Sequence, residues 1–255
     1  MAQHHPRATT NRGRCPVPSR HRNALTANGD LSGAALEGDD LYVAGTAQTG
    51  RCEVTEVLRV DLINGLAMPL VVARDCSWEP SPHVPRLSLR TTSGLPLRLT
   101  GVTVERPALA GHGLLFVATP QTDSSVAPPS ALVQLDLETG KATVVAESPT
   151  LISAVTADQD VTAFVAGQSL FTLVHKRLTL VEDTQNPIPT VSGPLISCGG
   201  GSGNVYDARN GTFYRPPIVG AWTILAGGWV SWFDGAANTY RVAHLQPSLL
   251  EQTNP

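Results

Sequence analysis

Histidine is the residue type in this chain best suited to chemistry at neutral pH, and four histidines lie near expected loops or strand ends. They are His83, His112, His175 and His244, and they belong to different parts of the sequence. If those parts surround a central channel, the four imidazoles could form a ring around it. A histidine that simply faces solvent is the commoner case. We select His112 and His175 as candidate binding residues.

Two acidic pairs are the next candidates, Asp39 with Asp40 and Asp158 with Asp160. Carboxylates this close in sequence can share a hard cation. Aspartate is also a good turn former, and neither pair has the length of a calcium loop. The glycine-rich run at 199–203 lacks the lysine and the helix of a phosphate-binding loop. The sequence therefore predicts no metal site and no cofactor.

Catalytic motifs are also missing, because no Ser-x-x-Lys or Gly-x-Ser-x-Gly sequence supplies a nucleophile. We identify no catalytic residue and favour a non-catalytic binding or scaffolding module over an enzyme. Its rim loops, including 120–130, would meet a protein or glycan partner. The alternative is a hydrolase or lyase, lactonase-like, with a metal or polar site at a central channel.

Trp229 and Trp232 lie in the most aromatic stretch of the chain, together with Phe233 and Tyr240. The two tryptophans are three residues apart, so they point to opposite faces of an ideal strand. One of them can then pack inside the protein while the other reaches the surface. An exposed tryptophan would mark a binding surface, and we add both to the candidate binding residues.

The four cysteines are Cys15, Cys52, Cys76 and Cys198. They contain no C-x-x-C pair, which argues against zinc. Cys52 and Cys76 flank one expected hairpin and could form a disulfide, which would favour a location outside the cytosol. Two ordinary thiols are the alternative, because sequence separation does not show that the two Cα atoms approach closely enough.

The amino-acid composition indicates a protein made mostly of short strands. Of 255 residues, 23 are glycine and 20 are proline, interleaved with short runs of valine, leucine and threonine, so we predict an all-β fold. The net charge of -3 does not favour nucleic acid as a partner. No apolar run approaches the ~20 residues of a membrane-spanning helix. We expect a monomer.

Domain boundaries follow from composition at the two ends. Residues 1–26 hold five arginines and no acid, and they lack the continuous apolar segment of a secretory signal, so we expect a disordered basic tail. Residues 27–248 are expected to form one domain, followed by a disordered tail at 249–255.

A repeated turn organises the expected strands. The stretches at 61–65, 136–141 and 207–211 each begin with aspartate, contain glycine and follow an apolar run. The aspartate can accept hydrogen bonds from backbone N–H groups of the turn, and the glycine can take positive φ. The first three aspartates are spaced by roughly twice 37 residues, with degenerate turns near Gly101 and Lys176, as in a repeat protein.

These turns, each following a hydrophobic strand, resemble those of the quinoprotein-like and YVTN-type β-propellers. The resemblance covers roughly residues 35–245 and implies blade architecture rather than a reaction, since no cofactor-binding motif of a quinoprotein dehydrogenase is matched. We predict a single β-propeller of six four-stranded blades, with five or seven as the alternatives. The N- and C-terminal segments would close the ring, with residues 23–27 supplying a strand missing from the last blade.

Overall fold

The computed structural model describes residues 31–49, 52–76, 95–120, 128–183, 188–198, 204–215, 224–234, 236–244 and 251–252. Within these ranges every regular element is a β-strand, which confirms the all-β prediction. The strands form five sheets of three to five strands each. None of the described residues belongs to a helix long and apolar enough to cross a membrane.

The first two sheets are formed by the chain up to Ser148, in sequence order. In the first sheet four antiparallel strands are followed by β5, which pairs parallel to β4. Its strands are β1 (Leu31–Glu37), β2 (Asp40–Thr49), β3 (Cys52–Asp61), β4 (Leu66–Asp75) and β5 (Leu97–Thr100). Those of the second sheet are β6 (Val102–Ala110), β7 (Gly113–Pro120), β8 (Ser130–Asp136) and β9 (Ala142–Ser148).

The other three sheets are formed by the rest of the chain. The third contains β10 (Ile152–Asp158), β11 (Val161–Ala166), β12 (Ser169–Val174) and β13 (Arg177–Asp183). The fourth contains β14 (Thr190–Ser192), β15 (Leu195–Ser197), β16 (Val205–Asp207), β17 (Thr212–Arg215) and β21 (Glu251–Gln252). The fifth contains β18 (Ile224–Ala226), β19 (Trp229–Asp234) and β20 (Thr239–His244).

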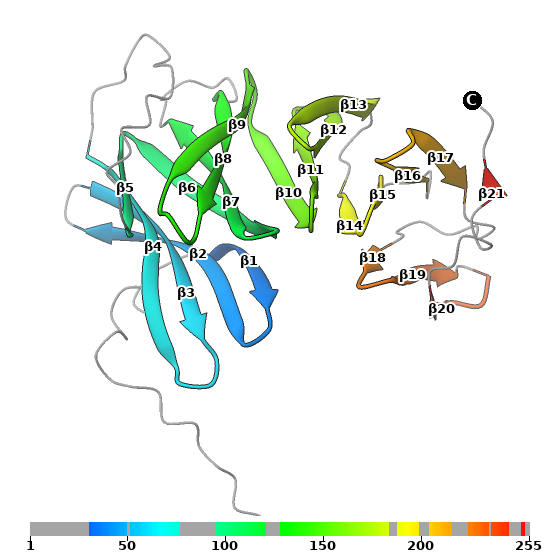
Figure 1. The fold of residues 1–255 in the computed structure, drawn as a ribbon, viewed down its shortest axis with the longest axis horizontal. Coiled ribbons are helices and arrows are strands. Elements are labelled where there is room, and N and C mark those ends of the chain that lie inside the picture. Colours follow the sequence, from blue (N-terminus) through cyan, green and yellow to red (C-terminus); the bar gives the residue numbers. More distant parts are fainter. Residues whose placement is uncertain are drawn as a thin grey trace, which may run out of the picture.

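The five sheets follow one another in a curved row (Figure 1). The first strand of each sheet contacts the first strand of the next, so β1, β6, β10, β14 and β18 form one continuous series. In a β-propeller the first strand of each blade is likewise the innermost one. The arrangement of the described sheets is therefore propeller-like.

Apolar cores lie between successive sheets. Phe116 of β7 and Leu70 of β4 belong to the core between the first and second sheets, whereas Leu115 and Ile152 belong to the core between the second and third. Every residue of β7 and β11 is buried, because each of these strands packs on both faces. The core between the fourth and fifth sheets is smaller, with Val205, Leu225 and Val230 as its buried residues.

Side chains also connect neighbouring sheets by hydrogen bonds. In each case an oxygen of one sheet accepts a hydrogen bond from a backbone N–H of the next, 2.7 or 2.8 Å away. The five pairs, acceptor first, are Thr55 with Val104, Ser130 with Ile152, Asp158 with Gly193, Thr190 with Leu225, and Ser192 with Gly228. These bonds fix how adjacent sheets sit on one another.

The predicted aspartate–glycine turns are confirmed. Asp136 Oδ1 accepts hydrogen bonds from the N–H groups of Glu138 and Thr139 at 2.9 and 2.8 Å. Gly140 has a φ of 67°, a conformation that glycine adopts without steric cost. The turn at 61–65 repeats both features, with Asp61 as the acceptor.

The prediction of six blades is not confirmed, since the described residues form five sheets. The spacing of the turns predicts a separate blade around the degenerate turn at Gly101. Instead, β5 extends the first sheet, Gly101 turns the chain, and β6 begins the second sheet. Asp61 and Asp136 are therefore separated by one repeat and not by two.

Ring closure by the two chain ends is not observed in the described part of the chain. Residues 23–27, expected to complete the last blade, lie outside the described residues, as does the predicted tail at 1–26. Within the predicted C-terminal tail, β21 pairs with β17 of the fourth sheet. No strand pairing joins the fifth sheet to the first among the described residues.

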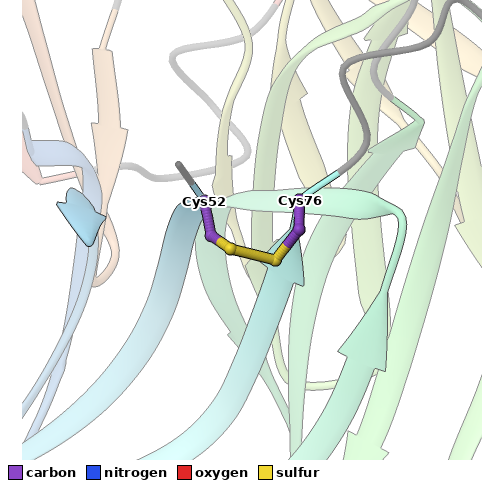
Figure 2. Close-up of a disulfide and its surroundings, with 2 residues drawn as sticks. All are labelled: Cys52 and Cys76. Carbon is purple, nitrogen blue, oxygen red and sulfur yellow. A yellow bond between two sulfur atoms is a disulfide. The ribbon is translucent and has the colours of Figure 1, made fainter. Parts of the chain in front are cut away.

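A disulfide joins Cys52, at the start of β3, to Cys76, which directly follows β4 (Figure 2). The two Cα atoms are 4.2 Å apart, and the bond lies beside the cross-strand pair Glu53 and Asp75. It closes the end of this hairpin that lies opposite the Asp61 turn. Cys52 and Cys76 therefore form a disulfide and are not two separate thiols.

Candidate functional site

A cleft of about 600 Å³ lies between the second and third sheets. It is formed by the hairpins β6–β7, β8–β9, β10–β11 and β12–β13, which all turn at the same end of the two sheets. We call it the lysine cleft. Its polar lining comprises His112, Gln134, Asp136, Lys141, Thr143, Gln159, Asp160, Thr162, His175 and Lys176, and its larger apolar residues are Leu115, Val144, Val145 and Leu173.

Lys141 and Lys176 are the only lysines in the chain, and both line this cleft. They occupy equivalent places, because Lys141 lies in the β8–β9 hairpin and Lys176 in the β12–β13 hairpin. Neither ammonium group forms an ion pair with a carboxylate of the described residues. The cleft therefore holds two cationic donors that can bind an external acceptor.

The two carboxylates of the cleft already have partners within the protein. Asp136 accepts the hydrogen bonds of its own turn, and the N–H of Thr139 is the main reason why the pKa of its carboxyl lies below the ordinary value. The charge of nearby His112 lowers that pKa further. Asp160 Oδ2 lies 3.2 Å from His175 Nε2. Neither acid forms an ion pair with Lys141 or Lys176.

A sharp turn positions His175 and Lys176 at the cleft. Val174 pairs with Arg177, so the hairpin has only these two residues between its strands, and both have positive φ, 47° and 66°. Asn-Gly is the usual sequence for such a turn, and a residue with a Cβ costs roughly 1 kcal/mol in this conformation. The neighbouring turn places Gln159, with a φ of 54°, in the same cleft.

A glycine shapes the wall of the cleft on the second sheet. A Cβ added to Gly113 would lie 2.7 Å from Gln134 Nε2. The side chain of Gln134 therefore lies directly over the backbone at this position. Because both residues line the cleft, glycine at 113 leaves the space that the amide of Gln134 occupies.

A second cleft, of about 670 Å³, lies at the corresponding end of the third, fourth and fifth sheets. Asp158 and Asp207 contribute its charges, and its described lining contains no lysine, arginine or histidine. Asp158 accepts a hydrogen bond from Gly193 N, and Asp207 accepts one from Arg209 N. Both carboxylates thus hold turns in place. The two clefts share Gln159 but differ in charge.

The structure divides the four predicted binding residues between two places. His112 and His175 line the lysine cleft together. Trp229 and Trp232 are far along the row, in the fifth sheet, and they point to opposite faces as predicted. Trp232 packs against the core shared with the fourth sheet, whereas Trp229 is half exposed and contacts the ring of His244.

Other sequence candidates are not brought together. Asp40 forms an ion pair with Arg59 at 2.6 Å, and Asp158 and Asp160 point to different partners. Across the described ranges, no group of three or more histidine, cysteine, aspartate or glutamate side chains is placed to hold a metal ion. His83 lies outside these ranges.

From the sequence alone, Lys141 and Lys176 are turn residues with no assigned role. The two positions nevertheless share a feature, because the only two lysines of the chain both lie at the turn between the third and fourth strands of a sheet. The missing information was that these two hairpins belong to neighbouring sheets. Only the assignment of sheets brings the two positions to one cleft.

Comparison with known proteins gives only distant structural similarity. No protein-family model matches the sequence, and no curated protein matches it. A prolyl endopeptidase structure is similar over 89% of this chain and 35% of its own, with 14% identity and a TM-score of 0.49, so this chain spans about a third of it. An oligogalacturonate lyase in complex with manganese is similar over 83% of this chain and 75% of its own, with 12% identity and a TM-score of 0.36. The oligogalacturonate lyase of Vibrio parahaemolyticus is similar over 80% of this chain and 74% of its own, with 10% identity and a TM-score of 0.40.

Proposed function

We propose that this protein is a non-catalytic binding module and that the lysine cleft binds an acidic glycan through a sugar that bears a carboxylate. The five described sheets would be blades of a β-propeller. Such a fold presents hairpin turns of neighbouring blades side by side, which is how it builds a site from distant parts of the sequence.

The observation that carries the proposal is the position of the two lysines. Both line one cleft, and neither is neutralised by a described carboxylate. Charge-assisted hydrogen bonds from ammonium to carboxylate are about twice as strong as neutral ones. An anionic group that enters the cleft would form ion pairs with the ammonium groups of both lysines.

The neutral lining supports a sugar as the carrier of that anion. Gln134, Thr143 and Gln159 offer donors and acceptors that suit hydroxyl groups, and the half-buried Leu173 offers an apolar surface for a ring face. The volume of about 600 Å³ falls within the range of small-molecule sites. One or two sugar residues of a glycan would occupy it.

Calorimetric titration with glucuronate, and with glucose as the uncharged counterpart, tests this proposal. We expect glucuronate to bind and glucose to bind at least ten-fold more weakly, since one charged hydrogen bond contributes roughly 1.5 to 3 kcal/mol. Lys141→Ala with Lys176→Ala should abolish the difference. Arg209→Ala removes an exposed cation from the corresponding hairpin of the fourth sheet and is the matched control. Equal binding of both sugars, or an equal loss in the control, would refute the proposal.

The alternative of a hydrolase or lyase has one observation in its favour. A histidine beside a carboxylate is a common acid–base arrangement, and His175 Nε2 lies 3.2 Å from Asp160 Oδ2 in the lysine cleft. Incubation with oligosaccharides of glucuronate distinguishes the two functions. Bond cleavage that His175→Gln abolishes, with binding retained, would establish the enzyme. Unchanged oligosaccharide would favour the binding module.

We also infer a location outside the cytosol, supported by the Cys52–Cys76 disulfide, because such bonds persist in oxidising compartments. An acidic glycan is a partner that a protein would meet there. Thiol alkylation of the protein isolated from its native compartment tests the inference. Complete alkylation of Cys52 and Cys76 without a reductant would contradict it.

A further inference from the structure

The charged residues of the lysine cleft form two matching sets, one on each side. The second sheet contributes His112, Asp136 and Lys141, and the third sheet contributes His175, Asp160 and Lys176. Each set comes from the first and third hairpins of its sheet, so both sheets place one acid, one histidine and one lysine at the cleft. No other acidic or basic residue is among the described residues that line it.

In both sets the histidine lies beside the aspartate. His175 Nε2 is 3.2 Å from Asp160 Oδ2, because the paired strands β11 and β12 bring their two turns together. On the other side, β7 and β8 are paired in the same way next to His112 and Asp136, and the charge of His112 acts on the Asp136 carboxylate. A protonated imidazole at either place therefore neutralises the carboxylate of its own sheet.

The total charge of the cleft depends on these two histidines. When both imidazoles are neutral, the charges of the two lysines and the two aspartates cancel. When both are protonated, the cations outnumber the carboxylates by two. Histidine is the side chain that ordinarily changes its charge between about pH 5 and pH 8, whereas aspartate and lysine ordinarily keep theirs throughout that range.

Other charged groups of the adjoining hairpins do not line the cleft. They are Glu138, Asp158 and Arg177, together with Glu37, Asp39 and Asp40 at the corresponding turn of the first sheet. Asp158 accepts a hydrogen bond from Gly193 N, and Arg177 is near enough to Tyr206 of the fourth sheet for its charge to act on that hydroxyl. Asp40 is paired with Arg59. Among the residues that line the cleft, the two histidines are therefore the groups that titrate near neutral pH.

We propose, building on the function proposed above, that protonation of His112 and His175 strengthens the binding of a carboxylate in the lysine cleft, so that acidic glycans bind more tightly at mildly acidic pH. The imidazolium groups would neutralise Asp136 and Asp160, and the field of the two lysines would then act on the ligand alone. His175 and Asp160 are exposed to solvent, so each histidine should change the affinity by about two- to five-fold, as exposed ion pairs do.

Calorimetric titration of the full chain with glucuronate, at about pH 5.5 and at about pH 8 and at equal ionic strength, tests the proposal. The carboxylate of the sugar is ionised at both values, so a difference reports on the protein. We expect binding to be about ten-fold tighter at the lower pH. Equal affinities would overturn the pH response and leave the proposed function standing. Absence of binding at both values would overturn the two together.

Paired substitutions identify the groups that are responsible. His112→Gln with His175→Gln should bind glucuronate at both pH values as the native chain does at the higher one. His112→Lys with His175→Lys, whose charges are fixed, should bind at both as the native chain does at the lower one. His244→Gln changes a histidine of the fifth sheet and is the control, which should keep the native pH dependence. A native pH dependence in the glutamine variant would overturn the proposal.

The histidine signals in the NMR spectrum supply a second readout, and the glutamine variant identifies those of His112 and His175 by their loss. A ligand that binds the protonated form more tightly must also favour protonation. Saturating glucuronate should therefore shift the midpoints of these two titrations to higher pH, and glucose should not. Midpoints that glucuronate leaves unchanged would contradict the proposal.

Discussion

The first and fifth sheets lie at the two ends of the same row and are stabilised very differently. The first has five strands and a disulfide, and even the face turned away from its neighbour holds the buried residues Val43 and Leu58. The fifth has three strands, and every residue of β20 except Ala243 is exposed to solvent. Both sheets have one described neighbour. The outer face of the first sheet is therefore covered, whereas that of the fifth is largely exposed.

Units that bury only one face gain stability mainly from the units beside them. The second and third sheets have neighbours on both sides, and they hold the lysine cleft between them. A site placed there rests on the best-packed part of the described chain. The fifth sheet, in contrast, has a small core and leaves most of β20 exposed.

The largest expected difference between the two ends concerns leucines of equal burial. Leu70 in the first sheet and Leu225 in the fifth are 1% and 2% exposed. Leu70→Ala should lower the free energy of unfolding by about 2 to 5 kcal/mol, because a large core surrounds the cavity. Leu225→Ala should mainly speed hydrogen exchange within 224–244, with a smaller effect on the main unfolding transition. Chemical denaturation followed by circular dichroism measures the first effect.

Equal losses of stability in the two alanine variants would contradict this contrast. They would show that the fifth sheet unfolds together with the rest of the chain, so that its packing contributes as much as that of the first sheet.

Loss of the disulfide, which only the first sheet has, should produce the second largest effect. Replacing Cys52 and Cys76 by serine should lower the free energy of unfolding by roughly 3 kcal/mol, since the bond closes a loop of 24 residues that the unfolded chain would otherwise leave free. Thermal unfolding of the native protein with and without reductant measures the same quantity. The reductant should have no effect on the serine variant, which is the control, and glucuronate binding should be unchanged.

The smallest effect concerns the aspartate turns at both ends. The pKa values of Asp61 and Asp234 are lowered, mainly by hydrogen bonds from the N–H groups of Asn64 and Ala237. A carboxyl with a lowered pKa in the folded state stabilises the protein above its ordinary pKa of 3.8. This contribution disappears as the pH falls below that value through the pKa of the folded state.

Asp61→Asn and Asp234→Asn should each flatten this part of the pH dependence of the unfolding midpoint. Both aspartates accept two backbone N–H groups of their turns, and Asp234 also pairs with Arg241 at 2.6 Å, so the effect of Asp234→Asn should be at least as large as that of Asp61→Asn. A steeper acid dependence in either variant would contradict the origin of the pKa shifts.

The sequence predicted much of the local structure. The Asp136 and Asp61 turns, their glycines and the opposite orientations of Trp229 and Trp232 all follow from short-range rules of backbone geometry. These features depend on residues close in sequence, and the rules that describe them need no knowledge of the fold.

The number of sheets and the site could not be predicted in the same way. Two strands separated by Gly101 gave the pattern of a worn repeat, but β5 pairs with β4 and β6 starts a new sheet. Sequence spacing does not reveal which partner a strand chooses. Likewise, the lysine cleft depends on two hairpins of neighbouring sheets, and their contact is set by long-range packing.

The two lysines allow one direct test of the central claim that an anion is bound between the second and third sheets. Reductive methylation with ¹³C-formaldehyde labels Lys141 and Lys176 and keeps their charge, so the side-chain NMR spectrum of the native chain contains two lysine signals. On titration with glucuronate, both signals should shift along the same saturation curve, and glucose should move neither. Two independent curves, or a shift of only one lysine, would contradict a single shared site.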